Sequence, residues 1–113
     1  MKKIQIAAHR GLSGANIPCN TPQAYQIALM QGADIVELDV APSADGALFV
    51  FHPGMEKPHL GCAQPIAQMS AAEVSGLRYL NQDDVPTHYG VARLDDVLEL
   101  LKGRCVVNVD KFW

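Results

Sequence analysis

The stretch IVELDV at residues 35–40, followed by the pair Asp45-Gly46 and the run LFVF at 48–51, decides the fold of this chain. Four of the six residues in 35–40 are apolar, which is typical of a strand buried in a sheet. Asp45-Gly46 predicts a tight turn. Residues 48–51 then either return as the hairpin partner of 35–40 or extend the loop above the sheet.

Two further short apolar runs predict strands, one before and one after this stretch, at Ile4–Ala8 and Cys105–Val109. The segments between the strands carry helix signals. Strands that alternate with helices predict an α/β fold with a parallel sheet and helices packed outside it.

Each predicted helix has its own start or stop signal. Residues 53–65 and 81–90 are rich in Gly, Pro or polar residues and are predicted to be loops. The three helices are predicted from the Thr21-Pro22 cap to Gly32, from the Ser70–Glu73 capping box to Leu77, and over Leu94–Leu101 closed by Lys102-Gly103.

Composition excludes several classes of protein. Hydrophobic residues make up 49% of the 113 residues and the net charge is −3, which favours a globular core and argues against a nucleic-acid-binding protein. The run after Met1-Lys2-Lys3 is short and stops at His9, so we interpret it as a strand and not as a signal peptide. No run is long enough for a transmembrane segment. Three cysteines without a CxxC motif favour a reduced compartment, and we expect a cytoplasmic protein.

The polar residues with catalytic chemistry gather where strands end. Ligands of parallel α/β proteins bind at that edge of the sheet. The candidate residues are His9, Arg10, Glu37, Asp39, His52 and Asp110, with Lys111 beside the last.

Glu37 and Asp39 are two residues apart, so on a strand their side chains point to the same face. Two neighbouring carboxylates repel each other and lose hydration when buried. A hard divalent cation, Mg²⁺ or Ca²⁺, would relieve both effects. Ordinary ion pairs with Arg or Lys are the alternative explanation.

His9-Arg10 joins a titratable imidazole to a cation that can bind phosphate through two hydrogen bonds. A histidine bonded to backbone groups, beside a surface arginine, would explain the pair equally well. Together with His52 and the three acids, however, such a set could bind a phosphate and move protons on both sides of it.

The remaining polar and aromatic residues are expected to have no catalytic role. Phe112 and Trp113 either belong to the core or line an apolar pocket. His59 and His88 are expected to be solvated or locally bonded, Glu56 and Lys57 to be solvated charges, and Cys19 to be a small packed residue.

An ordered set of motifs covers the first half of the chain and continues near its end. It comprises His9-Arg10-Gly11, Pro18-Cys19-Asn20-Thr21, Gly32-Ala33-Asp34, Glu37-Leu38-Asp39-Val40, Asp45-Gly46 and His52, and then Arg93–Leu98 and Asp110. In order and spacing this set resembles the glycerophosphodiester phosphodiesterase family.

The resemblance implies a TIM barrel and the hydrolysis of glycerophosphodiesters to an alcohol and glycerol 3-phosphate, a reaction of lipid metabolism. It implies that His9 and His52 are the general acid and base and that Arg10 holds the phosphate. It also implies that Glu37, Asp39 and Asp110 bind a divalent cation, Mg²⁺ or Ca²⁺. In the family, a neighbouring glycerol hydroxyl attacks phosphorus first, and water then opens a cyclic phosphate.

Several positions depart from the family pattern. Cys19 and Pro53 stand where the family has Glu and Asp, and Asp110 stands where it has Glu. Phe112 occupies the place of a lysine. Lys111 comes one residue early, which on a strand turns it to the other face.

A complete (β/α)₈ barrel needs about 250 residues. We therefore expect residues 1–113 to be the N-terminal part of one such domain, with about three of its eight strands. Open sheet edges would permit a homo-oligomer. The alternatives are a related barrel lyase that stops at a cyclic phosphate, and a non-catalytic interaction module.

Overall fold

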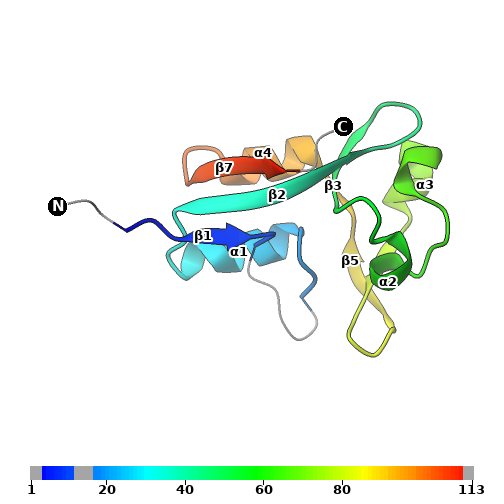
Figure 1. Ribbon diagram of the computed structural model, residues 1–113, viewed down its shortest axis with the longest axis horizontal. Coiled ribbons are helices and arrows are strands. Elements are labelled where there is room, and N and C mark those ends of the chain that lie inside the picture. Colours follow the sequence, from blue (N-terminus) through cyan, green and yellow to red (C-terminus); the bar gives the residue numbers. More distant parts are fainter. Residues whose placement is uncertain (1–3, 12–16, 111–113) are drawn as a thin grey trace.

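A three-stranded parallel sheet forms the centre of the computed structural model, which describes residues 4–11 and 17–110 (Figure 1). The middle strand, β2 (Ile35–Pro42), pairs in parallel with β1 (Ala7–His9) and with β7 (Val106–Asp110). The predicted parallel sheet is therefore confirmed. All three strands end at the same edge.

Of the two alternatives left open for residues 48–51, the structure has the hairpin. β3 (Leu48–Val50) returns antiparallel to β2, with Val50 opposite Val40. The two-residue strand β6 (Ala92–Arg93) extends this sheet on the other side of β3. The sheet is thus mixed, with parallel strands at one end of β2 and antiparallel strands at the other.

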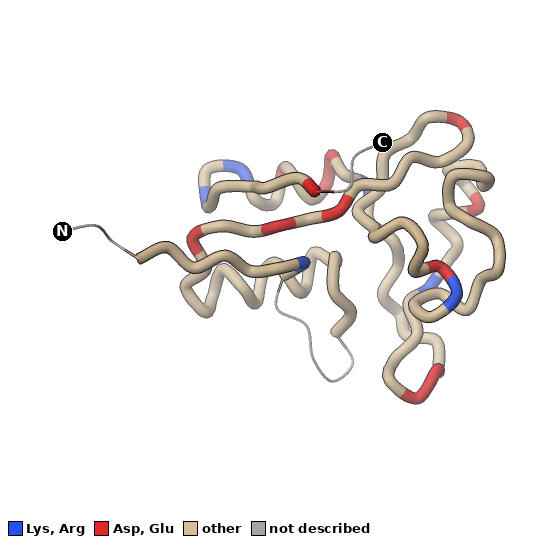
Figure 2. The backbone as a smooth tube through the Cα atoms, in the orientation of Figure 1, with Lys and Arg blue, Asp and Glu red and all other residues tan. Residues whose placement is uncertain are grey.

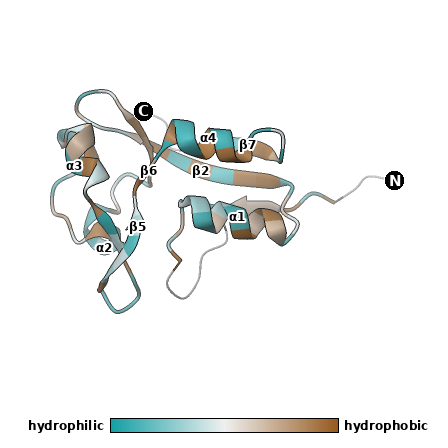
Figure 3. Cartoon of the chain, turned by 180° about the vertical axis from the view of Figure 1, so that it is seen from behind, coloured by the Kyte–Doolittle hydropathy of each residue, from teal (hydrophilic) through white to brown (hydrophobic). Residues whose placement is uncertain are grey.

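Two helices cover the same face of the parallel strands, and this arrangement is visible from both sides of the molecule (Figures 1 and 3). They are α1 (Pro22–Met30) and α4 (Leu94–Leu101). The Thr21 side chain caps α1 as predicted, accepting the Ala24 N–H at 3.2 Å. The alternate residues of β2 face these helices, and the core between them contains Tyr25, Val36, Leu38, Val40, Val50, Val97 and Leu101.

Strand periodicity explains where the acids of β2 lie. Because Val36, Leu38 and Val40 face the helices, Glu37 and Asp39 point to the opposite face. Figure 2 shows acidic residues along this strand. In a barrel, that face is the interior.

A second, smaller unit follows β3 and has its own core, which includes Phe51, Ile66, Met69, Val74 and Tyr79. Its elements are α2 (Glu56–Leu60), the 3₁₀ helix η1 (Ile66–Gln68), α3 (Ala71–Ser75) and the hairpin of β4 (Arg78–Leu80) with β5 (Pro86–Gly90). The predicted capping box is confirmed, since Ser70 and Glu73 bond each other's backbone N–H groups.

Helix α2 corrects the prediction of a loop over residues 53–65. Pro58 lies in its first turn, where N–H groups have no acceptor within the helix, so the proline removes no hydrogen bond. Gly61 ends the helix in a left-handed conformation with φ 65°. The expectation that Glu56 is solvated is also wrong, because only 7% of it is exposed. Lys57 is exposed as expected.

Two strand predictions need correction as well. Residues 86–90 form β5, although a polar loop was predicted there. The prediction failed because a strand in a hairpin exposed to water carries few apolar residues and therefore resembles a loop in sequence. The first strand was predicted over Ile4–Ala8, but β1 spans Ala7–His9. Pairing begins where Ala7 meets Ile35, the first residue of β2, so residues 4–6 have no paired strand residue opposite them among the described residues.

Candidate functional site

The acids predicted to bind a metal come together at the carboxyl end of the parallel strands. The β2–β7 register places Asp110 opposite Asp39, and Glu37 lies two residues before Asp39 on the same face. One carboxylate oxygen from each of the three residues lies within 4.8 Å of the others. This acidic cluster could bind a divalent cation, as carboxylate oxygens suit Mg²⁺ and Ca²⁺.

The strand β1 brings His9 and Arg10 to the same acids. His9 pairs with Glu37 in the parallel register, and its Nε2 lies 3.2 Å from Glu37 Oε1. The side chain of His9 is 63% exposed, so one side of the imidazole is open to a ligand.

Arg10 turns the chain away from β1 with a positive φ of 59°, and its backbone N–H donates to Glu37 O at 2.9 Å. Its Nε lies 3.1 Å from Asp39 Oδ2. Nε nevertheless makes no hydrogen bond within the described part of the chain. The Arg10–Asp39 contact is therefore an ion pair without hydrogen-bond alignment.

Asp39 is the fully buried member of the acidic cluster. Its Oδ2 accepts a hydrogen bond from Asn20 Nδ2 at 2.9 Å and faces Arg10. Its Oδ1 is buried and has no hydrogen-bond partner among the described residues. A buried carboxylate oxygen without a partner is costly, and a bound cation would satisfy it.

His52 follows the hairpin strand close to Asp39, since the N–H of Phe51 donates to Asp39 O at 3.0 Å. Its Nδ1 lies 2.8 Å from the Pro53 carbonyl oxygen. A carbonyl only accepts hydrogen bonds, so Nδ1 carries the proton and Nε2 of the neutral ring has a free lone pair.

Sequence reasoning missed three side chains around this site. Asn20 and Tyr25 are buried beneath Asp39, where Tyr25 Oη donates to Asn20 Oδ1 at 2.6 Å. Asn20 belongs to a motif that the sequence singled out, but Tyr25 carried no signal beyond its place in a helix. His59 was expected to be solvated or locally bonded. It is half-buried and lies against the rings of Phe51 and Tyr79.

The electrostatics of the neighbouring groups follow from burial. Burial raises the pKa of the Cys19 thiol, and Arg10 beside it counteracts part of that rise. Burial lowers the pKa of His59, and the electrostatic influence of Arg10 and His52 lowers it further. Cys19, Cys62 and Cys105 are all free thiols.

The predictions for Lys111, Phe112 and Trp113 lie outside the described residues.

Within the part of the chain that the structure describes, every helix is too short or too polar to cross a lipid bilayer.

Comparisons with known proteins agree on one family. The model of the glycerophosphoryl diester phosphodiesterase family matches residues 9–111. A glycerophosphodiester phosphodiesterase of Bacillus altitudinis is 52% identical over 48 residues, which are 42% of this chain and 19% of that protein. A probable glycerophosphodiester phosphodiesterase 1 of Mycobacterium tuberculosis is 39% identical over 75 residues, 66% of this chain and 27% of that protein.

Solved structures extend the match to nearly the whole chain. The glycerophosphodiester phosphodiesterase from Agrobacterium tumefaciens superposes with a TM-score of 0.84 at 38% identity, over 95% of this chain and 46% of that one. An Oleispira antarctica phosphodiesterase, solved with the product sn-glycerol-3-phosphate, gives a TM-score of 0.81 at 26% identity, over 96% of this chain and 44% of that one. The chain thus spans less than half the length of these relatives.

Proposed function

The chain belongs to the glycerophosphoryl diester phosphodiesterase family, and we propose that it supplies a catalytic site for glycerophosphodiester hydrolysis. The products are an alcohol and glycerol 3-phosphate. The observation that carries the proposal is the convergence of Glu37, Asp39 and Asp110 at the strand edge where His9 and Arg10 pair with two of these acids.

Glu37, Asp39 and Asp110 hold a divalent cation, Mg²⁺ or Ca²⁺. Asp39 Oδ1 supports this assignment, because it is a buried oxygen without a hydrogen-bond partner in the described part of the chain and needs a positive partner. The cation supplies charge neutralisation at the phosphoryl oxygens.

The two histidines transfer the protons. His52 accepts the proton of the attacking glycerol hydroxyl at Nε2, since its Nδ1–H is bonded to Pro53 O. His9, oriented by Glu37, donates a proton to the departing alcohol as its bond to phosphorus breaks. Water then opens the cyclic phosphate with the two roles reversed. Arg10 binds the phosphate through the guanidinium N–H groups that do not face Asp39.

The parallel strands of the described residues are too few to close a barrel. There are three of them, whereas a TIM barrel closes with eight. We therefore propose that residues 1–113 are the N-terminal part of such a barrel. The open sheet leaves the site without the walls that exclude water and position a substrate, so the chain alone should turn over very slowly.

A thermal unfolding series tests the metal site. Adding Ca²⁺ or Mg²⁺ should raise Tm of the wild-type chain, because a ligand bound only by the folded state stabilises it. Asp110→Asn should abolish the shift, and Asp83→Asn, an exposed acid in the β4–β5 turn, should preserve it. A wild-type Tm that neither cation changes would refute the cation assignment.

Product analysis with glycerophosphocholine and added cation tests the reaction. We expect trace formation of glycerol 3-phosphate. Turnover above about 1 s⁻¹, an ordinary enzyme rate, would contradict the partial-barrel proposal. Accumulation of a cyclic phosphate that never opens would contradict hydrolysis and favour a lyase.

A further inference from the structure

We infer that Tyr25 is a positioning residue for the metal-binding carboxylate of Asp39 and that it acts through Asn20. All three side chains are buried, with 1% exposure or less. The inference extends the proposed function, because it assigns a support to one of the three metal ligands.

A continuous hydrogen-bond chain links the three residues. Tyr25 Oη donates to Asn20 Oδ1 at 2.6 Å, and Asn20 Nδ2 donates to Asp39 Oδ2 at 2.9 Å. The backbone N–H of Asp39 also approaches Asn20 Oδ1, at 3.4 Å. Burial raises the pKa of Tyr25, so its hydroxyl stays protonated and can donate.

These hydrogen bonds fix the orientation of the Asn20 amide. The reversed amide would set its oxygen against the Asp39 carboxylate and its NH₂ against the Asp39 backbone N–H. The hydroxyl of Tyr25 adds a donor at Oδ1 and thereby strengthens the observed orientation. The amide in turn determines which oxygen of Asp39 accepts a hydrogen bond from the protein.

The orientation of the Asn20 amide gives the two oxygens of Asp39 different surroundings. Oδ2 accepts from Asn20 and faces Arg10, while Oδ1 has no hydrogen-bond partner in the described residues. The carboxylate is therefore held with one oxygen bonded to the protein and the other free for a cation. Residues that orient a metal ligand in this way commonly change metal affinity by about 10- to 100-fold when mutated.

The backbone around Asn20 and Tyr25 holds Tyr25 in place. Asn20 has a positive φ of 58°, and its N–H donates to Arg10 O at 2.8 Å. Thr21 then starts α1, which carries Tyr25 back beneath the site. Gly11 packs so closely here that an added Cβ would lie 2.9 Å from the Tyr25 ring and 2.8 Å from the Ala24 backbone.

Tyr25→Phe tests the inference, and Tyr79→Phe is its matched control. Both tyrosines are buried, but the Tyr79 hydroxyl has no hydrogen-bond partner among the described residues. Calorimetric titration with Ca²⁺ or Mg²⁺ should show affinity at least about tenfold weaker in Tyr25→Phe. We expect Tyr79→Phe to stay close to the wild-type affinity. Equal affinity in Tyr25→Phe and the wild type would overturn the inference.

Nuclear magnetic resonance of the Asn20 side-chain NH₂ gives a second readout that does not require metal. In the wild type these protons should exchange slowly with solvent, and their shifts should move in Tyr25→Phe but not in Tyr79→Phe. Rapid exchange in the wild type, or unchanged shifts in Tyr25→Phe, would also overturn the inference. If the wild type binds neither cation, the proposed metal site fails, and the Asn20 resonances alone decide the role of Tyr25.

Discussion

The imidazole of His59 lies in an apolar setting beside a charged site. Its ring is edge-on to Phe51, with centroids 6.3 Å apart, and tilted against Tyr79 at 6.4 Å. Burial lowers its pKa, and the electrostatic influence of Arg10 and His52 lowers it further. The folded chain therefore favours the neutral form of His59.

This preference makes stability depend on pH. The pKa of His59 in the unfolded chain is about 6.5, and the folded value is lower, so the unfolded state binds more protons in the window between the two. The free energy of unfolding should therefore rise with pH through that window and level off above it. His59→Gln should flatten this dependence in urea unfolding from pH 5 to 8, whereas His88→Gln, at an exposed histidine, should retain it. Parallel curves for His59→Gln and the wild type would contradict the expectation.

Helix α2 is held to its surroundings by the buried carboxylate of Glu56. Its Oε2 accepts the Gly54 N–H at 2.9 Å, and its Oε1 accepts the Ile66 N–H at 3.2 Å. One side chain thus joins the start of the helix, the loop after His52 and the first residue of η1. Because the N–H of Met55 also donates to His52 O, this clamp secures the turn that follows His52.

Glu56→Gln should weaken the clamp, because a glutamine has one acceptor oxygen and its NH₂ would face a backbone donor. We expect a loss of about 1–3 kcal/mol in the free energy of unfolding, the cost of a buried group left unsatisfied. Lys57→Gln, at the exposed neighbouring position, should change it by less than about 0.5 kcal/mol. Urea denaturation measures both variants, and equal midpoints for the two would argue against the clamp.

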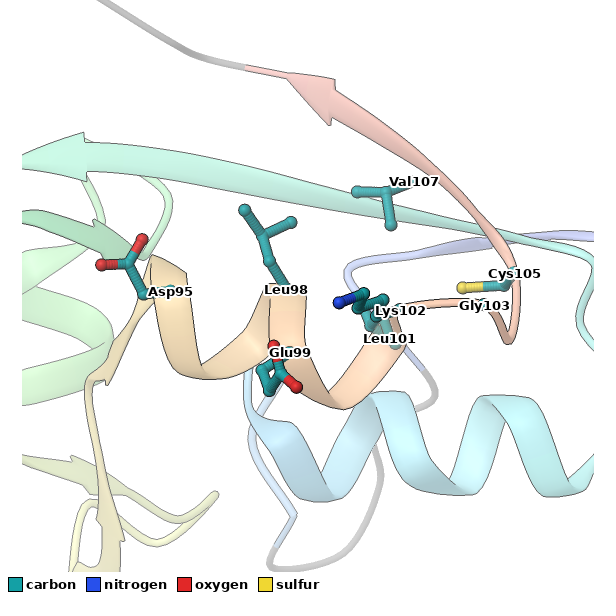
Figure 4. A pocket seen from close by; sticks show the side chains of 8 residues that line it. All are labelled: Asp95, Leu98, Glu99, Leu101, Lys102, Gly103, Cys105 and Val107. Carbon is teal, nitrogen blue, oxygen red and sulfur yellow. The ribbon is translucent and has the colours of Figure 1, made fainter.

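The sheet is open on both sides among the described residues, since β1 and β7 each pair only with β2. Apolar side chains are exposed along or just before these edge strands, with Ile4 at 86% and Val106 at 58%. Figure 4 shows a groove between α4 and β7 that includes Leu98, Cys105 and Val107. Unpaired edges and exposed apolar residues are the features through which strands associate.

We therefore predict that the isolated chain self-associates through these edges. Val106→Lys should shift sedimentation toward the monomer, because an edge lysine opposes strand pairing. Val85→Lys is the control, since Val85 is similarly exposed at 53% but lies in the β4–β5 turn. A wild-type chain that sediments as a monomer at all concentrations would show the prediction to be wrong.

The sequence alone determined the strand β2 and the acid pair that it carries. Their signals are local, because the apolar alternation around Glu37 and Asp39 requires a strand with both carboxylates on one face. The same holds for the Thr21 and Ser70 caps, whose hydrogen bonds span three residues.

Only the tertiary structure decided the supports of the site. Glu56 is buried because Ile66, ten residues away, donates to it, and Asn20 meets Asp39 across 19 residues. The strand β5 likewise exists through its pairing with β4 and not through apolar periodicity. Contacts between distant segments leave no periodic trace in the sequence, since they depend on how complete elements pack against one another.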